Sequence, residues 1–428
     1  MGVIFHGLVM RLYRLSIGLS AVFGHAKARG WLTMRKGSLD GLRNSTSQLK
    51  QRQQWMWFHC ASVGEYEQAL PVMESWRKLH PDDALLLSFY SASGLEAFAL
   101  RQPEWWKEFD YATAMPLDVR PAVQAFIVAA GGTMRLKGLL ITKYDVWPTL
   151  LSLLRSDGVP VGLFAAHVLP GRWPFRFGGN YQRQAWKSMR HIWVQTELSL
   201  SSLSRYDINA EVAGDPRFDR VIEAVSQHRI DEALRSWVND RPCLVVGSAW
   251  QSELAAARES WQQGLCAIVV PHEWTIASMA DEVARWELTG ARPVLWSAHR
   301  GREARAVLPP GDVLIVDAFG ELLNAYALAD VAVVGGGFGK GVHNTLEPAA
   351  HGKRILVGPN VQRFAEVAAL EKTGALTVCD SQSALCVQIQ AALHDLESTR
   401  QLGAQAEAYA RQNVGAGKTI AHGWAQKI

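Results

Sequence analysis

One acidic residue has a position that suits proton transfer. Glu65 lies in HCASVGEYEQALP, residues 59–71, directly after an apolar run at 55–60. Ser62 and Gly64 predict a turn, and Glu65 begins an amphipathic helix, where it can act as general base on a substrate hydroxyl. The positive helix end predicts a lowered pKa that keeps Glu65 ionised. A capping box between Ser62 and Glu65 explains the same residues, and spacing alone favours it.

A second stretch has the same strand-then-helix form. ITKYDVWPTLL, residues 141–151, places Lys143 and Asp145 between an apolar run and a helix that begins near Trp147-Pro148. Lys143 is suited to hold a substrate carboxylate or phosphate, and Asp145 to orient it. An ion pair on a solvated face predicts the same residue types.

Arginines follow in two places. The segment 167–183 combines Arg172 and Arg176 with aromatic residues and has no helical period. This composition is typical of a loop that meets an anionic, partly apolar ligand, and also of a packed surface loop. AGDPRFDRV, residues 213–221, places Arg217 at a helix start, where it can neutralise negative charge or simply be solvated.

A glycine-rich stretch marks the second half of the chain. The apolar run 331–334 ends in three consecutive glycines, Gly337 being the third, and the pattern predicts a strand, a tight loop and a helix beginning near Asn344. The backbone N–H groups of such a loop can approach a phosphate closely, and the helix start adds partial positive charge. Glu347 is placed to bind ribose hydroxyls. A glycine-rich connection in any doubly wound sheet has the same pattern.

Three further loops follow strand-like runs in this half. They are GSAWQSE at 247–253, which contains Ser248, PHE at Pro271–Glu273, and DAFGELL at 317–323. In one parallel sheet these loops would gather at the carboxyl edge beside the glycine loop. Their convergence favours a nucleotide-binding site.

The alternation of short apolar runs with helical stretches indicates an α/β protein with two Rossmann-like domains. The chain has 428 residues, of which 48% are hydrophobic and 20% charged, enough for two globular cores. We predict an N-terminal segment at 1–36, a first domain at 37–214 and a second at 215–428, whose last helix packs back on the first domain. The predicted strands are 55–60, 84–89, 139–142, 159–165, 192–195, 243–247, 267–270, 313–316, 331–334, 355–357 and 376–379.

Charge and cysteine usage restrict the class of partner. A net charge of +4 with a pI near 8.8 is too weakly basic to indicate nucleic acid, but it is compatible with an anionic membrane or a phosphorylated substrate. The five cysteines contain no C-x-x-C pair and are typical of core thiols in a reducing compartment. The pattern indicates no metal site.

The N-terminal segment has the pattern of a membrane-surface helix. Apolar residues recur at helical spacing over 3–24, and a basic tract with Trp31 follows (Lys27, Arg29, Arg35, Lys36). The longest uncharged run is too short to span a bilayer, so we predict a membrane-associated segment on a cytoplasmic leaflet. A tilted helix with snorkelling arginines is a second interpretation of the same residues. An ordinary helix packed on the domain is the alternative.

Six motifs taken in order resemble the 3-deoxy-D-manno-octulosonic acid (Kdo) transferases. They are SVGE at 62–65, KYDVWP at 143–148, GDPRFDRV at 214–221, GSAW at 247–250, PHE at 271–273 and GGGFGKGVHNTLEPAAHGKRILVGPN at 335–360. The Lys-Tyr-acid and GGGFGKG forms resemble the version of Bacteroidetes-type bacteria. Many relatives carry Glu-Thr-Glu where residues 143–145 stand, so a glutamate's role cannot be transferred to Lys143.

The resemblance implies a GT-B fold with two Rossmann-like domains around a central cleft, and an inverting reaction without metal or other cofactor. Kdo would pass from CMP-Kdo to a lipid A precursor (lipid IVA) at the inner membrane. Glu65 would be the base, and Lys143 or Asp145 with Arg217 would stabilise charge. Acceptor contacts would involve Ser62, Gly64, Arg172 and Arg176. The donor contacts would come from Ser248, Pro271, His272, Glu273, Phe319, Gly320, Glu321, Gly337, Asn344, Thr345, Leu346 and Glu347.

Two other functions fit parts of the pattern. A different GT-B enzyme of nucleotide sugars, such as a UDP-sugar epimerase or another glycosyltransferase, would share the fold without the membrane-surface helix. A peripheral membrane scaffold would bind a nucleotide without turnover. Loss of transfer with retained nucleotide binding after substitution of Glu65 would separate an enzyme from the scaffold.

Overall fold

The computed structural model describes residues 2–169, 175, 179–227, 229–297, 308–318, 320–362 and 364–428, with the side chains of 2–5 left out. The predicted site residues Arg172, Arg176 and Phe319 lie outside these ranges. The chain divides into two compact units, residues 1–220 with 414–428, and residues 221–413. The predicted boundary, between 214 and 215, lies slightly before the first of these divisions.

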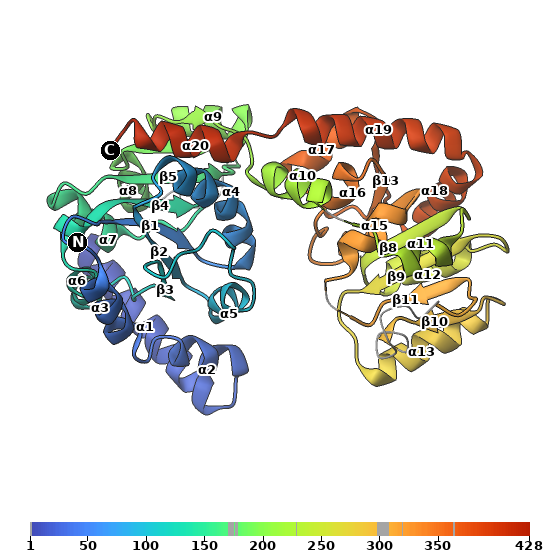
Figure 1. The fold of residues 1–428 in the computed structure, drawn as a ribbon, viewed down its shortest axis with the longest axis horizontal. Helices are drawn as coiled ribbons and strands as arrows, with labels where there is room; N and C mark the ends of the chain where they lie inside the picture. The colour runs from blue at the N-terminus through green and yellow to red at the C-terminus, as the bar shows by residue number, and fades with distance from the viewer. Residues whose placement is uncertain are drawn as a thin grey trace. The chain divides into compact units, whose positions relative to one another are not determined.

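Unit 1 is built on a parallel sheet of seven strands in the order β3-β2-β1-β4-β5-β6-β7 (Figure 1). Its central strands β1, β2 and β5 are buried along their whole length and mostly apolar, because helices cover both faces. The strands are β1 Trp55–Cys60, β2 Ala84–Phe89, β3 Tyr111–Ala114, β4 Leu136–Thr142, β5 Val161–Ala166, β6 His191–Val194 and β7 Glu211–Val212.

The helices of unit 1 come from both ends of the chain. The last helix, drawn in red in Figure 1, packs against α4, and the Trp424 ring lies where a Cβ on Gly138 or Gly162 would clash, 2.9 Å away in each case. The helices are α1 Gly2–Val22, α2 Ala26–Thr33, α3 Ser38–Gln48, α4 Val63–Leu79, α5 Ala92–Leu100, α6 Arg120–Ala129, α7 Pro148–Ser156, α8 Asn180–Lys187, α9 Glu197–Ser204, α10 Arg217–Gln227, which runs across the boundary, and α20 Ala416–Ala425.

Unit 2 repeats the architecture with a second seven-stranded parallel sheet, in the order β10-β11-β9-β8-β12-β13-β14. The strands are β8 Cys243–Ala249, β9 Cys266–Pro271, β10 Pro293–Leu295, β11 Val313–Ile315, β12 Val331–Val334, β13 Arg354–Val357 and β14 Leu376–Val378. The helices are α11 Glu232–Val238, α12 Gln251–Ser260, α13 Ile276–Glu287, α15 Leu322–Leu328, α16 Leu346–Ala350, α17 Ala365–Lys372, α18 Gln382–His394 and α19 Leu396–Gln412. Four cysteines are buried and Cys386 is half-buried, and none of the five forms a disulfide.

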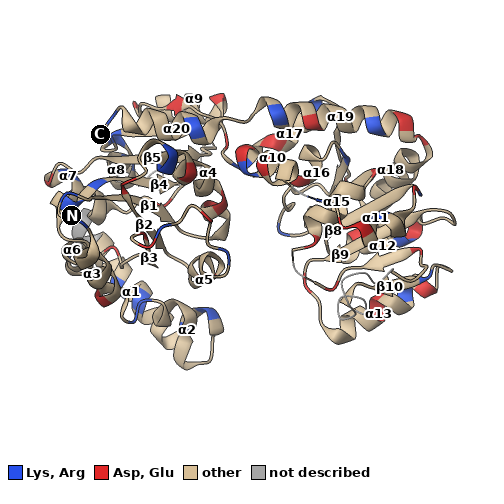
Figure 2. Ribbon diagram, viewed as in Figure 1, with Lys and Arg blue, Asp and Glu red and all other residues tan. Residues whose placement is uncertain are grey.

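Helix α1 is held at its start and exposed along one apolar row. His6 Nε2 lies 2.7 Å from Asp118 Oδ2, and Asp118 also accepts the N–H groups of Thr149 and Leu150 at the start of α7. Leu8, Leu12, Leu15, Leu19 and Val22 are all more than half exposed. In Figure 2, α1 carries Lys or Arg and no acidic residue. Within the described ranges, no helix has the length and apolar character needed to cross a membrane.

The predicted role of Trp31 as an exposed interfacial residue is wrong. Its side chain is 7% exposed and packs with Met10 and Leu117, while the Arg35 guanidinium lies 3.6 Å from its ring centroid. The short connection between α2 and α3 folds Arg35 back over the preceding turn, where its Nη1 donates to the carbonyl of Trp31. The packing of Trp31 therefore holds α1 and α2 against the rest of unit 1.

Candidate functional site

The start of α4 places Glu65 at the carboxyl end of β1. Ser62 is the N-cap residue, but its side chain makes no capping bond, whereas Glu65 Oε2 accepts the N–H of Ala61. Only the carboxylate half of the capping arrangement therefore forms. Ser62 is exposed, and no atom lies within 4 Å of a Cβ built on Gly64, so the helix start is open beside the carboxylate.

The carboxyl group of Glu65 is harder to ionise than the sequence predicts. Burial, and next the negative charge of Asp145, raise its pKa to about 7, against the opposing effects of the Ala61 N–H and the Lys143 ammonium. The prediction of a lowered pKa is wrong because desolvation and repulsion outweigh the helix end. A carboxylate with a pKa near neutral is well matched to proton abstraction at physiological pH.

Asp145 is held by a histidine that the sequence interpretation overlooked. The fully buried His59 places its Nε2 3.2 Å from Asp145 Oδ2, and the same nitrogen accepts the indole N–H of Trp147 at 3.1 Å. Its Nδ1 faces the carbonyl of Ser88 at 3.1 Å, which can only accept. His59 thus carries its hydrogen on Nδ1, and its contact with Asp145 is attractive only when a proton lies between them. A polar residue inside an otherwise apolar strand, just before SVGE, was the available signal.

Lys143 follows β4 in a left-handed backbone conformation, with φ of 71°. Such a conformation is unfavourable for a lysine and is kept only where neighbouring structure enforces it. The ammonium lies 5.6 Å from the ring centroid of Tyr144, whose hydroxyl donates to the carbonyl of His167. The ends of β1 and β4 therefore bring Glu65, Lys143 and Asp145 into one electrostatic cluster.

Arg217 is held by an acidic neighbour. Its Nε and Nη2 lie 2.8 Å and 2.6 Å from Asp215 Oδ2, and Gln68 donates to the other oxygen of that carboxylate. Burial raises the pKa of Asp215, but Arg217 and these hydrogen bonds outweigh it, and the pKa falls below its usual range. A role for Arg217 on a substrate anion stays a prediction.

The three consecutive glycines of unit 2 are required by chain packing. A Cβ on Gly335 would lie 2.0 Å from the carbonyl oxygen of Ser248, and one on Gly337 would lie 2.5 Å from the nitrogen of Gly358. Gly336 has φ of 90°, and its N–H donates to Glu253 at 2.9 Å. Neighbouring main chain thus fills the Cβ side of Gly335 and Gly337, and the approach of the loop's N–H groups to a phosphate stays a prediction.

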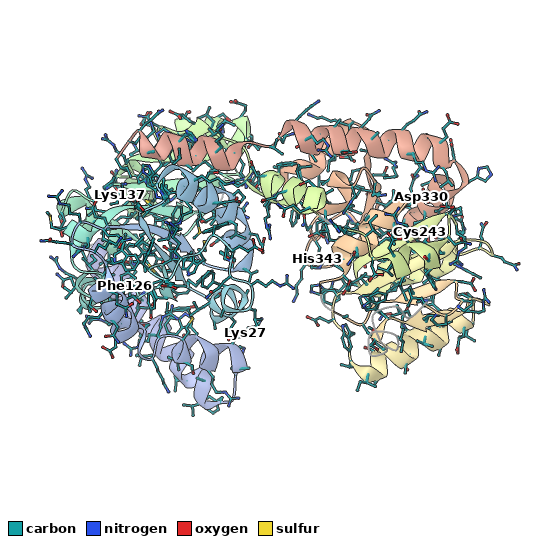
Figure 3. The ribbon with its side chains drawn as sticks, viewed as in Figure 1. Lys27, Phe126, Lys137, Cys243, Asp330 and His343 are labelled. Atoms are coloured by element: carbon teal, nitrogen blue, oxygen red, sulfur yellow. The ribbon has the colours of Figure 1, made fainter. Side chains whose placement is uncertain are left out.

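An aromatic stack lies beside this loop. The ring of His272 lies 4.9 Å from that of Trp250 and 4.2 Å from that of His343, which Figure 3 labels. Burial, and next His272, lower the pKa of His343, so it is neutral at pH 7. Trp250 is 41% exposed, which leaves part of its ring available to a ligand. Trp250 and His343 were not among the predicted residues, although both lie in the quoted motifs.

The other predicted donor residues differ in exposure. Helix α16 begins at Leu346, two residues after Asn344, and the Asn344 side chain accepts the N–H of Leu346 and donates to Glu347 at 3.0 Å. Leu346 is fully buried in the core, which is unfavourable for a ligand contact by its side chain. Thr345 is also buried, and its hydroxyl has no partner among the described residues.

The remaining donor candidates lie at two neighbouring strand ends. Ser248, with φ of 51°, belongs to the irregular end of β8, and Pro271 ends β9. His272 donates its N–H to Ala249, and Glu273 is exposed. Gly320 has φ of 88°, and the buried Glu321 accepts from Asn324 at 2.9 Å.

The sheets define a GT-B type of protein, and comparison with solved structures agrees. A UDP-GlcNAc 2-epimerase from Neisseria meningitidis matches with a TM-score of 0.59 over 87% of this chain and 100% of its own, at 12% identity. A glycosyltransferase from Rickettsia africae matches with a TM-score of 0.55 over 88% and 98%, at 9% identity. At such low identity these likenesses establish the fold alone.

The chain is a homologue of the Kdo transferases. Residues 37–220 match the family model described as 3-deoxy-D-manno-octulosonic-acid transferase. The 3-deoxy-D-manno-octulosonic acid transferase of Bordetella pertussis is 27% identical over 77% of each chain. That of Haemophilus influenzae is 24% identical over 85% of this chain and 84% of its own. The resemblance predicted from the motifs is confirmed, and the Bacteroidetes-type subgroup stays a prediction.

Proposed function

We propose that this chain is an inverting glycosyltransferase that moves Kdo from CMP-Kdo onto a lipid A precursor, lipid IVA, in lipopolysaccharide biosynthesis. The observation that carries the proposal is Glu65, a half-buried carboxylate with a pKa of about 7 at the start of α4, next to the exposed Ser62 and Gly64. It lies within the part of the chain that matches the Kdo transferase model. The two relatives named above carry this activity in their names.

In the proposed reaction, Glu65 removes the proton from a sugar hydroxyl of the acceptor. The oxygen forms a bond to the anomeric carbon of Kdo while the bond from that carbon to the CMP phosphate oxygen breaks. The electron pair leaves with CMP, and attack from the opposite face inverts the configuration. A base with a pKa near 7 is ionised in part at neutral pH and still accepts a proton readily.

Lys143 is proposed to attract the negative charge of the donor beside Glu65, and Asp145 is proposed to set the pKa of Glu65. Kdo carries its own carboxylate. The Lys143 ammonium, two residues before Asp145 in the chain, lowers the pKa of Glu65. An ammonium at this place favours an incoming anion and the ionised form of Glu65 together. Asp145, held by His59, orients the cluster and sets how readily Glu65 takes a proton.

The donor nucleotide is proposed to bind unit 2. The exposed part of the Trp250 ring offers a face for the cytosine base, since nucleobases stack on aromatic side chains. Glu347, oriented by Asn344, is suited to accept hydrogen bonds from the two ribose hydroxyls. Ser248 and the backbone of Gly320 and Glu321 are the proposed further contacts.

Helix α1 is proposed to rest on the cytoplasmic face of the inner membrane, where the acyl chains of the acceptor reside. Its row of leucines is exposed to solvent, and the basic residues Arg11 and Arg14 lie on the same helix. An apolar row beside cations favours an anionic bilayer surface. Removal of α1 should release the protein from anionic vesicles in a flotation assay, whereas unchanged flotation would contradict this placement.

Incubation of the full chain with CMP-Kdo and the lipid A precursor, followed by mass spectrometry, tests the function directly. The expected product is the precursor with added Kdo and an equivalent amount of CMP. A UDP-sugar in place of CMP-Kdo is the matched control, because structural neighbours include UDP-sugar enzymes. Conversion of the UDP-sugar with no use of CMP-Kdo would overturn the proposal.

A further inference from the structure

A separate pocket lies in unit 1 under the N-terminal helices. It has a volume of about 450 Å³ and is bounded by α1, α2, α3, the end of β3 and α6. Trp31, Met115 and Phe126 supply apolar wall, and Phe126 is labelled in Figure 3. None of the residues assigned above to the base or the donor lines it. A cavity with an apolar wall and charged groups at one side suits an amphiphilic ligand.

Three cations and no carboxylate line this pocket. They are Arg14 on α1 and the adjacent Arg35 and Lys36 after α2. The first acidic residue of the chain is Asp40, and no described carboxylate forms an ion pair with any of the three. An anion in the pocket would therefore meet an uncompensated positive field.

Arg35 is a partly buried cation of this pocket, and no described carboxylate forms an ion pair with it. Its guanidinium lies between the rings of Trp31 and Tyr90 and donates to the carbonyl oxygens of both residues, at 2.9 Å and 3.2 Å. Its Nε is buried without a partner among the described groups, and burial lowers the pKa of Arg35 to about 10. A buried cation without a counter-charge is unfavourable, and a bound anion would offset that penalty.

The helix that contributes Arg14 to the pocket also has an exposed apolar row. Arg14 belongs to the helix whose row of Leu8, Leu12, Leu15 and Leu19 is exposed. A ligand with a negative headgroup and hydrocarbon chains can satisfy both features at once, with the headgroup among the cations and the chains along α1. Inorganic phosphate or a soluble sugar phosphate would leave the row exposed to water.

We propose that this pocket binds the phosphate headgroup of an anionic glycerophospholipid of the bilayer. The proposal goes beyond the transfer reaction and shares with it only the proposed contact of α1 with a membrane. The lipid phosphate accepts hydrogen bonds from Arg35 and Lys36, Arg14 adds a third positive charge, and the acyl chains lie along the leucine row. Bound lipid would fix the N-terminal helices of unit 1 to the membrane surface at a defined point.

The test is calorimetric titration of the full chain with dihexanoylphosphatidylglycerol at concentrations where it is monomeric, so that no bilayer surface potential contributes. Saturable binding is expected. Lys36→Met and Arg14→Met should each weaken binding about tenfold, as for loss of one charge-assisted hydrogen bond or contact. Both side chains are exposed, so these variants should fold, and Arg35→Lys keeps the charge but removes the guanidinium fork.

The matched control is Lys27→Met, which removes the same charge from an exposed lysine of α2 that does not line the pocket and lies apart from Phe126 in Figure 3. Its affinity should equal that of the unmodified protein. No saturable binding, or equal affinity of the Lys36 and Lys27 variants, would overturn the proposal. So would glycerol 3-phosphate or dihexanoylphosphatidylcholine binding as tightly as the anionic lipid. No transfer is measured, so either proposal can fail without the other.

Discussion

Each of the two sheets has a register irregularity near the carboxyl end of one strand, and the surroundings of the two sheets differ there. In β5 the irregularity carries Ala165 with φ of 54°, and in β8 it carries Ser248 with φ of 51°. At the carboxyl edge of the unit 1 sheet, the titratable side chains of Glu65, Lys143 and Asp145 interact with one another. In unit 2 the carbonyl oxygen of Ser248 instead meets the main chain of the glycine loop, and aromatic rings lie alongside.

The comparison indicates how one architecture can separate binding from chemistry. Burial, and next the charge of Asp145, raise the pKa of Glu65, which prepares a base, whereas the glycine loop of unit 2 lies beside the stacked rings of His272 and His343. Substitutions in unit 1 should therefore change the rate and its pH dependence. Substitutions in unit 2 should change nucleotide affinity or the stability of that unit.

The largest expected effect is that of Glu65→Gln. Loss of a general base should reduce transfer by ~10²–10⁴-fold, while CMP affinity measured by calorimetry stays unchanged because the nucleotide site is on the other unit. Glu74→Gln, on the same helix α4, is the control and should retain full activity. Undiminished transfer by the Glu65 variant would show that Glu65 is not the general base. The assignment of chemistry to unit 1 and of binding to unit 2 would then be wrong.

A stability change of intermediate size should follow Gly337→Ala. The new methyl group would lie 2.5 Å from the nitrogen of Gly358, and overpacking of this kind destabilises by about 1–3 kcal/mol. Gly339→Ala is the matched control, because the nearest atom to its Cβ is 3.7 Å away. Denaturant unfolding measures both, and equal stability of the two variants would show that the loop is not packed as described.

Glu347→Gln should weaken CMP binding by about tenfold, the loss of one hydrogen bond to a charged group. Acceptor affinity should be unaffected, since Glu347 belongs to unit 2. Cytosine alone serves as the control ligand, because it lacks the ribose and should bind both proteins equally. Identical CMP affinity in the variant would exclude Glu347 as the ribose contact.

The smallest effect is a shift in pH dependence on Asp145→Asn. Glu65 acts when ionised, so transfer should fall about tenfold per pH unit below its pKa of about 7. The negative charge of Asp145 raises that pKa, and its removal should move the acidic midpoint of kcat/KM to lower pH, whatever the loss in absolute rate. An unchanged midpoint would contradict the influence of Asp145 on the pKa of Glu65.

Sequence patterns predicted best three strands in which every residue is buried. The strands at 55–60, 84–89 and 331–334 begin and end where predicted, because they are buried on both faces. The missed strands β3, β7 and β10 are two to four residues long and lie at or near the sheet edges, where few apolar residues are needed. The helix predicted to begin at Glu65 starts two residues earlier, at Val63, and the helix predicted to begin near Trp147-Pro148 starts at Pro148.

Tertiary effects account for the errors at the site. The raised pKa of Glu65 depends on burial and on Asp145, eighty residues away in the chain, and no local pattern carries that information. The packing partners of Gly335 and Gly337 are also distant in sequence, since Ser248 lies near the end of β8 and Gly358 follows β13. The contact of His59 with Trp147 and Asp145 likewise joins separate motifs.

The position of α20 has a consequence for how the chain matures during synthesis. Trp424 covers Gly138 and Gly162 at the centre of the unit 1 sheet, yet it leaves the ribosome only after all of unit 2. Until then part of one apolar face of β4 and β5 stays uncovered. We therefore expect a chaperone to bind unit 1 at this stage. Nascent chains stalled before residue 414 should therefore be degraded as incomplete, even though every residue of the proposed base cluster is already present.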